Sequence, residues 1–83
     1  MKMEYSKILT LRIKQLCKQH KLTINRLAAL SNLKQSTIDN IIRNKSRNPK
    51  ICTLHKIATT FNMTLSEFLD FEELNDYSID DEE

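Results

Sequence analysis

The chain contains no glycine, and this absence restricts how its helices can end. Glycine usually supplies the left-handed backbone conformation at a helix end, because it has no Cβ atom to clash there. Asparagine is the best substitute, since its short amide can form local hydrogen bonds in that conformation. Asparagine follows three segments of helical periodicity, so we expect Asn32, Asn44 and Asn62 to take the glycine position. Lys21 stands at the first junction, where the sequence offers no comparable explanation.

Apolar side chains recur at helical spacing in five segments, and no alternating run predicts a strand. The segments cover residues 6–20, 22–31, 35–43, 51–61 and 64–71. Ser6 and Thr23 are expected N-caps, and Thr64 with Glu67 has the spacing of a capping box. We therefore predict an all-α fold.

The 83 residues are enough for one domain with one small core. No apolar run is long enough to cross a membrane, and the first residues show no signal peptide. We therefore expect a cytoplasmic protein that makes no membrane contact. Cys17 and Cys52 both have apolar neighbours, so we expect them to be reduced residues of the core.

Charge is divided unevenly along the chain, although the net charge is only +2. Residues 1–66 hold all 13 lysines and arginines against two acids, Glu4 and Asp39, which is an excess of eleven positive charges. Residues 67–83 hold the other nine of the 11 acids and no base. A strongly basic body indicates a polyanion partner, most commonly nucleic acid. The acidic end indicates a tail or a contact with a partner protein.

Residues 22–43 contain two short helical segments joined by a turn of about four residues, and the second begins with polar side chains. This pattern predicts a helix-turn-helix. A DNA major groove admits one α-helix, whose N-terminal turn meets the base edges. The side chains in that position are Lys34, Gln35, Ser36 and Thr37, with Asn40 one turn further along. An ordinary solvated helix face is the alternative interpretation.

The run from Arg12 to about Phe68 resembles the Cro/C1-type, or XRE-like, helix-turn-helix family of small phage and bacterial repressors. The matching stretches are RIKQL, LTINRLA, SNLKQSTI, RNKSRNP and TLHKIATTFNMTLSEFL, in this order and spacing. The resemblance implies a compact five-helix, lambda-repressor-like domain, which we assign to residues 6–70, with its third helix at about 35–43 in the major groove. Residues 71–83 are then an acidic C-terminal extension.

The resemblance also implies which residues contact double-stranded DNA. Gln35, Ser36 and Asn40 match positions that read bases in the family, and helix geometry adds Lys34 and Thr37. Phosphate contacts are expected around the groove helix. The residues expected there are Thr23, Arg43, Asn44, Lys45 and Arg47.

The chain departs from the family at three positions. Ile24 stands where many members have a glutamine that helps to hold a phosphate, so that contact is in doubt. Cys17 and Ile42 stand where many members have an arginine and a glutamate that pair. Exchanging both partners of a buried ion pair for apolar groups is physically coherent, so we expect Cys17 and Ile42 to touch in the core.

The acidic end carries an apolar stripe that a family dimer could use, because such repressors usually bind palindromic sites as two-fold dimers. The residues expected at this homodimer contact are Leu65, Phe68, Leu69, Phe71 and Leu74. The alternative is that these residues only close the monomer core and that a solvated tail follows. The final DDEE is hypothesised to compete with DNA for the basic face.

The leading interpretation is a sequence-specific DNA-binding transcriptional regulator that represses by blocking polymerase. An antitoxin that regulates its own synthesis, with the acidic tail as a binding segment, is the first alternative, and a helical protein-interaction module is the second. His20 and His55 have no partners at metal-ligand spacing, and no nucleophile–base set is visible. We therefore expect no catalytic residue, metal or cofactor, and no enzymatic activity.

Overall fold

The computed structural model describes residues 4–45 and 48–78, and over these residues the chain is all-helical. The six helices are α1 (Tyr5–Gln19), α2 (Ile24–Leu30), α3 (Gln35–Ile42), α4 (Ile51–Thr60), α5 (Leu65–Leu69) and α6 (Glu72–Asn75). The all-α prediction is confirmed, and the four-residue α6 is an addition to the five expected helices. Among the described residues, no helix combines the length and apolar character needed to span a bilayer.

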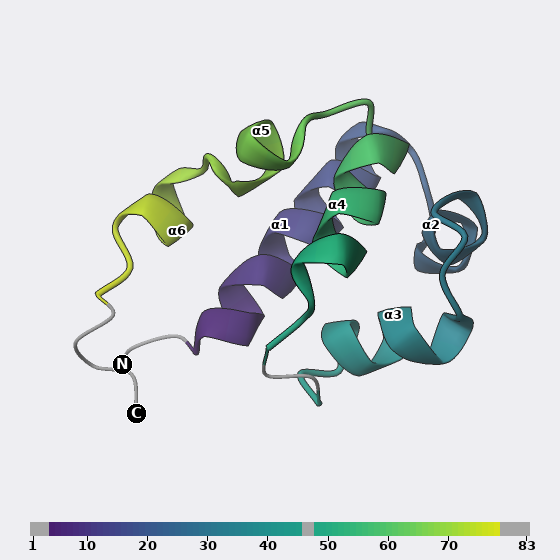
Figure 1. The fold of residues 1–83 in the computed structure, drawn as a ribbon, viewed down its shortest axis with the longest axis horizontal. Coiled ribbons are helices and arrows are strands. Elements are labelled where there is room, and N and C mark those ends of the chain that lie inside the picture. Colours follow the sequence, from purple (N-terminus) through teal and green to yellow (C-terminus); the bar gives the residue numbers. More distant parts are fainter. Residues whose placement is uncertain (1–3, 46–47, 79–83) are drawn as a thin grey trace.

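The helices pack around a single hydrophobic core. Figure 1 shows how they are arranged. α1 contacts α2, α3 and α6, while α4 contacts α2 and α5. The largest fully buried side chains come from five of the helices and the segments between them: Leu9, Ile13, Leu27, Ile38, Ile41, Ile57, Phe61 and Phe68. The helices α1 to α5 therefore each bury apolar side chains and leave polar side chains exposed, as the helical periodicity predicts, whereas no residue of α6 is fully buried.

The four long junctions all close in the same way, without glycine. Lys21, Asn32, Asn44 and Asn62 have φ values of 55°, 58°, 61° and 61°, the left-handed conformation. At each junction the next residue donates its amide back to a carbonyl five residues earlier, as in Leu33 to Ala28 at 3.1 Å. The left-handed residue itself donates its amide to a carbonyl three residues earlier, as in Asn32 to Ala29 at 3.3 Å. The two bonds together form a Schellman motif, which satisfies the last carbonyls of a helix. The asparagine prediction is confirmed, and lysine performs the same role at the first corner.

Of the three N-caps that the sequence predicts, two are present and one is not. The hydroxyl of Thr23 accepts from the amide of Arg26, and Thr64 with Glu67 forms the complete capping box. The prediction for Ser6 is wrong, because α1 begins at Tyr5 and Ser6 lies buried within the first turn. Its hydroxyl donates to the side-chain oxygen of Asn44, which is 38 positions further along the chain.

The first part of the acidic extension packs onto the domain. Phe71 is buried in the core, and α6 contacts α1. The rings of Tyr77 and Tyr5 meet edge to face at 5.3 Å between centroids. The guanidinium carbon of Arg12 lies 5.0 Å from the centroid of the Phe71 ring. Residues 71–77 thus belong to the folded body rather than to a solvated tail.

The two cysteines have different surroundings. Cys17 is buried in the core, where burial raises the pKa of its thiol, so it is a poor nucleophile. The prediction for Cys52 is wrong, because its side chain is exposed on the outer face of α4. Ile42 packs against the same apolar cluster that contains Cys17. A direct contact between Cys17 and Ile42 stays a prediction.

Candidate nucleic-acid interface

The corner between α2 and α3 is held by a buried serine and a left-handed asparagine. Ser31 is buried, and its hydroxyl donates to the main-chain oxygen of Leu27 at 2.7 Å and of Ala28 at 3.2 Å. Asn32 then reverses the chain, and Leu33 is half-buried against the core. These local bonds set the direction in which α3 leaves the turn, so the corner orients the second helix of the pair.

α3 is anchored by one face and exposed on the other. Ile38 and Ile41 are buried, whereas Ser36, Asn40 and Arg43 are exposed. Positions 36, 40 and 43 differ by four and three residues, so they lie on one stripe of the helical surface. The structure therefore presents a polar stripe along a helix whose opposite face is held by the core.

The N-terminus of α3 has no side-chain cap. Lys34 is the N-cap residue in an extended conformation, and it makes no capping hydrogen bond. The first amides of α3 therefore have no side-chain cap, and the N-cap residue carries a positive charge. Gln35 and Ser36 are exposed beside them, while Thr37 is half-buried. Four of the five expected base readers are thus exposed and one is partly covered.

Asp39 is a residue of this surface that the sequence interpretation did not include. The Nε2 atom of Gln35 donates to Oδ1 of Asp39 at 3.0 Å, one helical turn away. This bond holds the Gln35 amide in one orientation and leaves its oxygen as a free acceptor. The spacing of four residues between a glutamine and an aspartate is the signal that could have identified the pair.

The residues expected at phosphates have unequal surroundings. Arg43 and Lys45 are exposed at the C-terminal end of α3, and Thr23 is exposed at the start of α2. Arg47 lies outside the described residues. Asn44 is half-buried, and its amide donates to the Glu4 carboxylate at 2.8 Å while its oxygen accepts from Ser6. The side chain of Asn44 is therefore engaged with the start of α1.

A second bond ties α3 to α1, and sequence reasoning did not identify it. The buried hydroxyl of Thr10 donates to the main-chain oxygen of Ile41 at 2.8 Å. Together with the Asn44 contacts, it attaches the C-terminal end of α3 to the first two turns of α1. The helix that carries the exposed stripe is therefore attached to α1 by hydrogen bonds as well as by core packing.

Comparison with known proteins identifies the family. Residues 12–73 match the Cro/C1-type HTH DNA-binding domain. The chain belongs to this family. It is also similar to the prophage Lp1 protein 11, whose crystal structure superposes with a TM-score of 0.80 at 32% sequence identity. That likeness covers 93% of this chain and 100% of the other. Among curated proteins, no match to the chain was found.

The resemblance inferred from the motifs is therefore confirmed, and α2 with α3 forms the helix-turn-helix of a Cro/C1-type domain. In this domain, two of the residues expected at a dimer contact are packed in the core instead. Phe68 and Phe71 are buried in the core of one molecule, with 0% and 9% of their surface exposed. Leu65, Leu69 and Leu74 are half-buried and keep part of their apolar surface exposed.

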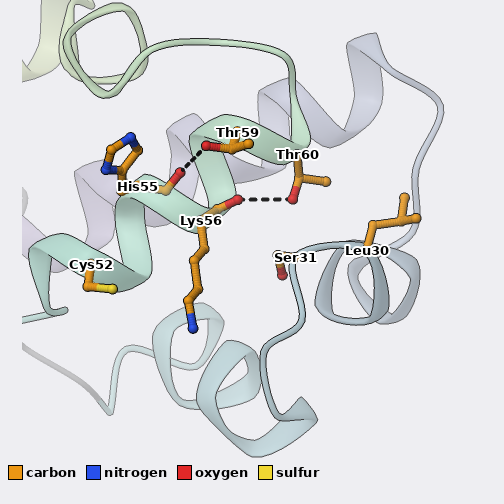
Figure 2. Close-up of a pocket in the computed structure, with 7 residues that line it drawn as sticks. All are labelled: Leu30, Ser31, Cys52, His55, Lys56, Thr59 and Thr60. Carbon is orange, nitrogen blue, oxygen red and sulfur yellow. Dashed lines mark hydrogen bonds between the residues drawn. The ribbon is translucent and has the colours of Figure 1, made fainter.

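A hollow of about 420 Å³ lies between the end of α2 and α4 of the Cro/C1-type domain. Figure 2 shows its lining residues: Leu30, Ser31, Cys52, His55, Lys56, Thr59 and Thr60. Cys52 and His55 are one turn apart on α4, but their side chains do not point toward one another (Figure 2). Over the described residues there is no group of three or more histidine, cysteine or acidic side chains placed to hold a metal ion. The Cro/C1-type family is typically non-enzymatic.

Proposed function

We propose that the chain is a sequence-specific transcriptional regulator that inserts α3 into the DNA major groove and acts as a repressor. The observation that carries this proposal is the exposed polar stripe of Ser36, Asn40 and Arg43 on a helix anchored within a Cro/C1-type domain. One α-helix fits the major groove, and the N-terminal turn of a recognition helix meets the bases.

The side chains at the start of α3 suit base reading. Gln35 and Asn40 can each form paired hydrogen bonds with adenine, and Lys34 can donate to guanine. The bond from Gln35 to Asp39 orients the Gln35 amide before DNA arrives, which lowers the entropy lost on binding. Ser36 and Thr37 can donate or accept, and they complete the proposed reading surface.

The cations at and after the C-terminal end of the stripe suit the DNA backbone. Arg43 and Lys45 lie exposed where α3 ends, and Arg47 follows them in the sequence. Arginine can bind a phosphate with two parallel hydrogen bonds, and lysine adds charge. The N-terminus of α2 after Thr23 offers a second contact, because free amides at a helix start favour a phosphate.

Repression follows from occlusion, since a protein bound over a promoter excludes polymerase. We propose that two copies bind a palindromic site, as is usual for helix-turn-helix proteins. The half-buried side chains of Leu65, Leu69 and Leu74 supply the apolar surface for this contact. A dimer that uses only these residues is small, so it forms most completely on DNA, where both copies are held together.

The test is the selection of bound duplexes from a random DNA library with the full-length protein. Enrichment of a palindrome with half-sites about one helical turn apart supports a dimeric groove-reading regulator. Enrichment of a single half-site keeps the base reading and removes the dimer. The absence of enrichment with a folded protein contradicts the proposal and favours a protein-binding role such as that of an antitoxin.

Point variants then test the placement of α3. Gln35→Ala should relax base preference at one position of the site, at a cost of about 1–3 kcal/mol for the preferred base. Lys45→Ala should weaken all sequences equally and reduce the slope of affinity against salt by about one. Gln15→Ala, an exposed glutamine on α1, is the matched control and should change neither. Identical behaviour of the Gln35 and Lys45 variants contradicts the assigned roles.

A further inference from the structure

A basic hollow lies between α1 and the C-terminal end of α3, and its volume is about 370 Å³. Three cations line it: Lys7 and Lys14 come from α1, and Arg43 directly follows α3. Leu11, with 38% of its surface exposed, and the half-buried Ile42 add apolar surface to the lining. A ligand that complements this hollow has to carry negative charge and present an apolar face.

The other polar groups of this hollow are already engaged within the molecule. The Thr10 hydroxyl donates to the main-chain oxygen of Ile41, and the Asn44 amide donates to the Glu4 carboxylate. By contrast, the three cations have no ion-pair partner among the described residues. Their N–H groups are therefore the donors that a ligand meets there. The acids of residues 80–83, which are hypothesised to compete with DNA for the basic face, lie outside the described residues, so that competition stays a prediction.

The hollow adjoins the polar stripe of α3 that is proposed to read bases. Arg43 belongs both to this stripe and to the lining of the hollow. In Figure 1, the first turns of α1 lie beside the C-terminal end of α3, and the bond from Thr10 to Ile41 joins the two helices there. The major groove is about 12 Å wide, and a helix with its side chains is about 10–12 Å across. Groups immediately beside α3 therefore meet the phosphates that border the groove.

We propose that this hollow binds the DNA backbone at one deoxyribose and the phosphates on either side of it. Lys7 and Lys14 lie about 10.5 Å apart along the axis of α1, and Leu11 is between them. The lysines contact the two phosphates, and the C–H face of the sugar packs on Leu11 and Ile42. A free phosphate ion would supply the charge without the apolar face. The inference rests on the proposed function, because it places α3 in the groove.

The contact makes α1 a third DNA-binding element beside α2 and α3. Thr10 lies between the two lysines on the same side of α1, because positions 7, 10 and 14 differ by three and four residues. The bond from Thr10 to Ile41 therefore holds both lysines in place relative to α3. Contacts to phosphates fix the position of a protein on the duplex but do not read the sequence. The hollow thus raises the affinity for all sequences alike and leaves base preference to α3.

Salt-dependent binding of the full-length protein tests the charges. The probes are the duplex enriched from the random library and a random duplex of equal length. Lys7→Gln with Lys14→Gln should weaken binding to both by the same factor, roughly 10- to 30-fold at 0.15 M salt, and reduce the salt slope by about two. Both side chains are exposed, so circular dichroism should show an unchanged fold. Unchanged affinity and slope overturn the proposal.

A matched lysine separates the hollow from the general charge of the protein. Lys18 is an exposed lysine one turn beyond Lys14 on α1, and it does not line the hollow. Lys18→Gln should leave the salt slope unchanged, whereas Lys14→Gln alone should reduce it by about one. Equal effects of the two single variants overturn the assignment to the hollow.

The apolar part of the contact is tested by methyl NMR on the complex with DNA. The methyl groups of Leu11 and Ile42 should show nuclear Overhauser effects to deoxyribose protons, and those of the buried Ile38 should show none. Absence of the effects at Leu11 and Ile42 in the saturated complex overturns the proposal. Resonances of residues 7–14 that move with inorganic phosphate but not with the duplex overturn it in favour of a free anion.

An acid placed in the hollow gives an independent measurement. Leu11→Glu should weaken both duplexes about fivefold at 0.15 M salt, because its carboxylate cancels one cation. Gln19→Glu adds the same charge at an exposed position two turns further along α1 and should have a clearly smaller effect. Equal weakening by the two variants contradicts a backbone contact at Leu11.

These experiments distinguish failure of the inference from failure of the proposed function. An enriched sequence whose affinity does not depend on Lys7 and Lys14 keeps the proposed function and overturns the role of the hollow. Binding to random duplexes that depends on these lysines, without enrichment of any sequence, keeps the hollow as a backbone site and overturns sequence-specific reading. A folded protein that binds no duplex overturns both.

Discussion

The hydroxyl of Thr10 in α1 donates a buried hydrogen bond of 2.8 Å to the main-chain oxygen of Ile41 in α3. This oxygen also accepts from the amide of Asn44 at the corner that follows α3. One carbonyl at the end of α3 therefore joins the corner to a residue of α1 that lies 31 positions earlier in the chain. The orientation of α3 depends on α1 as well as on the turn before it.

Replacing Thr10 by valine tests this connection. Valine keeps the shape of threonine but lacks the hydroxyl, so the variant should lose about 0.5–1.5 kcal/mol of unfolding free energy, measured by urea titration. Thr59→Val is the matched control, since the Thr59 hydroxyl bonds to the main-chain oxygen of His55 on an exposed face. The control should change stability by less than about 0.5 kcal/mol. Equal losses in the two variants would contradict the role of Thr10.

Arg12 joins α1 to the start of the acidic extension. Its Nε donates to the Phe68 oxygen at 2.9 Å, its Nη2 donates to the Glu67 oxygen at 3.1 Å, and its guanidinium lies over Phe71. Arg12→Ala removes two charge-assisted bonds to the last carbonyls of α5 and one cation–π contact. We expect a loss of about 1.5–3 kcal/mol in unfolding free energy.

Chemical denaturation of the unmodified protein, Arg12→Lys and Arg12→Ala separates the effect of the charge from that of the forked geometry. Arg12→Lys keeps the charge but not the forked geometry, so its stability should lie between those of the unmodified protein and Arg12→Ala. Gln15→Ala, at an exposed position of the same helix, should be close to neutral. A lysine variant as stable as the unmodified protein would show that charge alone holds the segment.

Lys21 is the most strained of the four corners, because a lysine in the left-handed conformation places its Cβ against the following carbonyl. Glycine removes this clash, which costs about 1–2 kcal/mol. Glycine also makes the unfolded chain more flexible, which lowers stability by about 0.5–1 kcal/mol. Lys21→Gly should therefore raise the melting temperature through a net gain of up to about 1 kcal/mol. Asn62→Gly should gain less, since asparagine tolerates this conformation. Destabilisation of the Lys21 variant would contradict this account.

The capping box of α5 predicts a pH dependence. Hydrogen bonds from the Thr64 amide and hydroxyl lower the pKa of the exposed Glu67 carboxyl from its ordinary value of 4.5. A group whose pKa is lower in the folded state stabilises the protein above its unfolded pKa. That contribution is lost as the pH falls below about 4.5 and through the folded pKa.

Urea titrations between pH 6 and pH 3 check this prediction. Glu67→Gln keeps a side chain that can complete the capping box but does not titrate. The unfolding free energy of the unmodified protein should therefore fall more steeply below about pH 4.5 than that of the variant. Parallel profiles of the two proteins would show that the Glu67 carboxylate does not contribute.

Local chemistry made much of the fold predictable. The asparagine corners, the Thr23 cap and the capping box at Thr64 depend on bonds between residues at most five positions apart. Such bonds follow from neighbouring residue types, so they can be read before any packing is known. The helix-turn-helix was visible for the same reason, because it consists of two periodic segments and one such corner.

The candidate site was predictable only in part. The sequence identified the exposed polar residues of α3, since a helical stripe follows from spacing alone. It did not reveal that the Asn44 side chain is engaged by α1, nor that Cys52 is exposed. Both outcomes depend on which faces meet in the folded chain, and an amide or thiol suits an interior or an exterior position equally well.

The sequence by itself determined the helices, their corners and the polar stripe, because each is set by residues close together in the chain. Only the tertiary structure decided that Ser6 is buried against Asn44, 38 positions away, instead of capping α1. It also decided that Arg12 draws residues near Phe68 onto α1 across 56 positions. Contacts at such separations gain their free energy when the common core forms, and no local pattern records them.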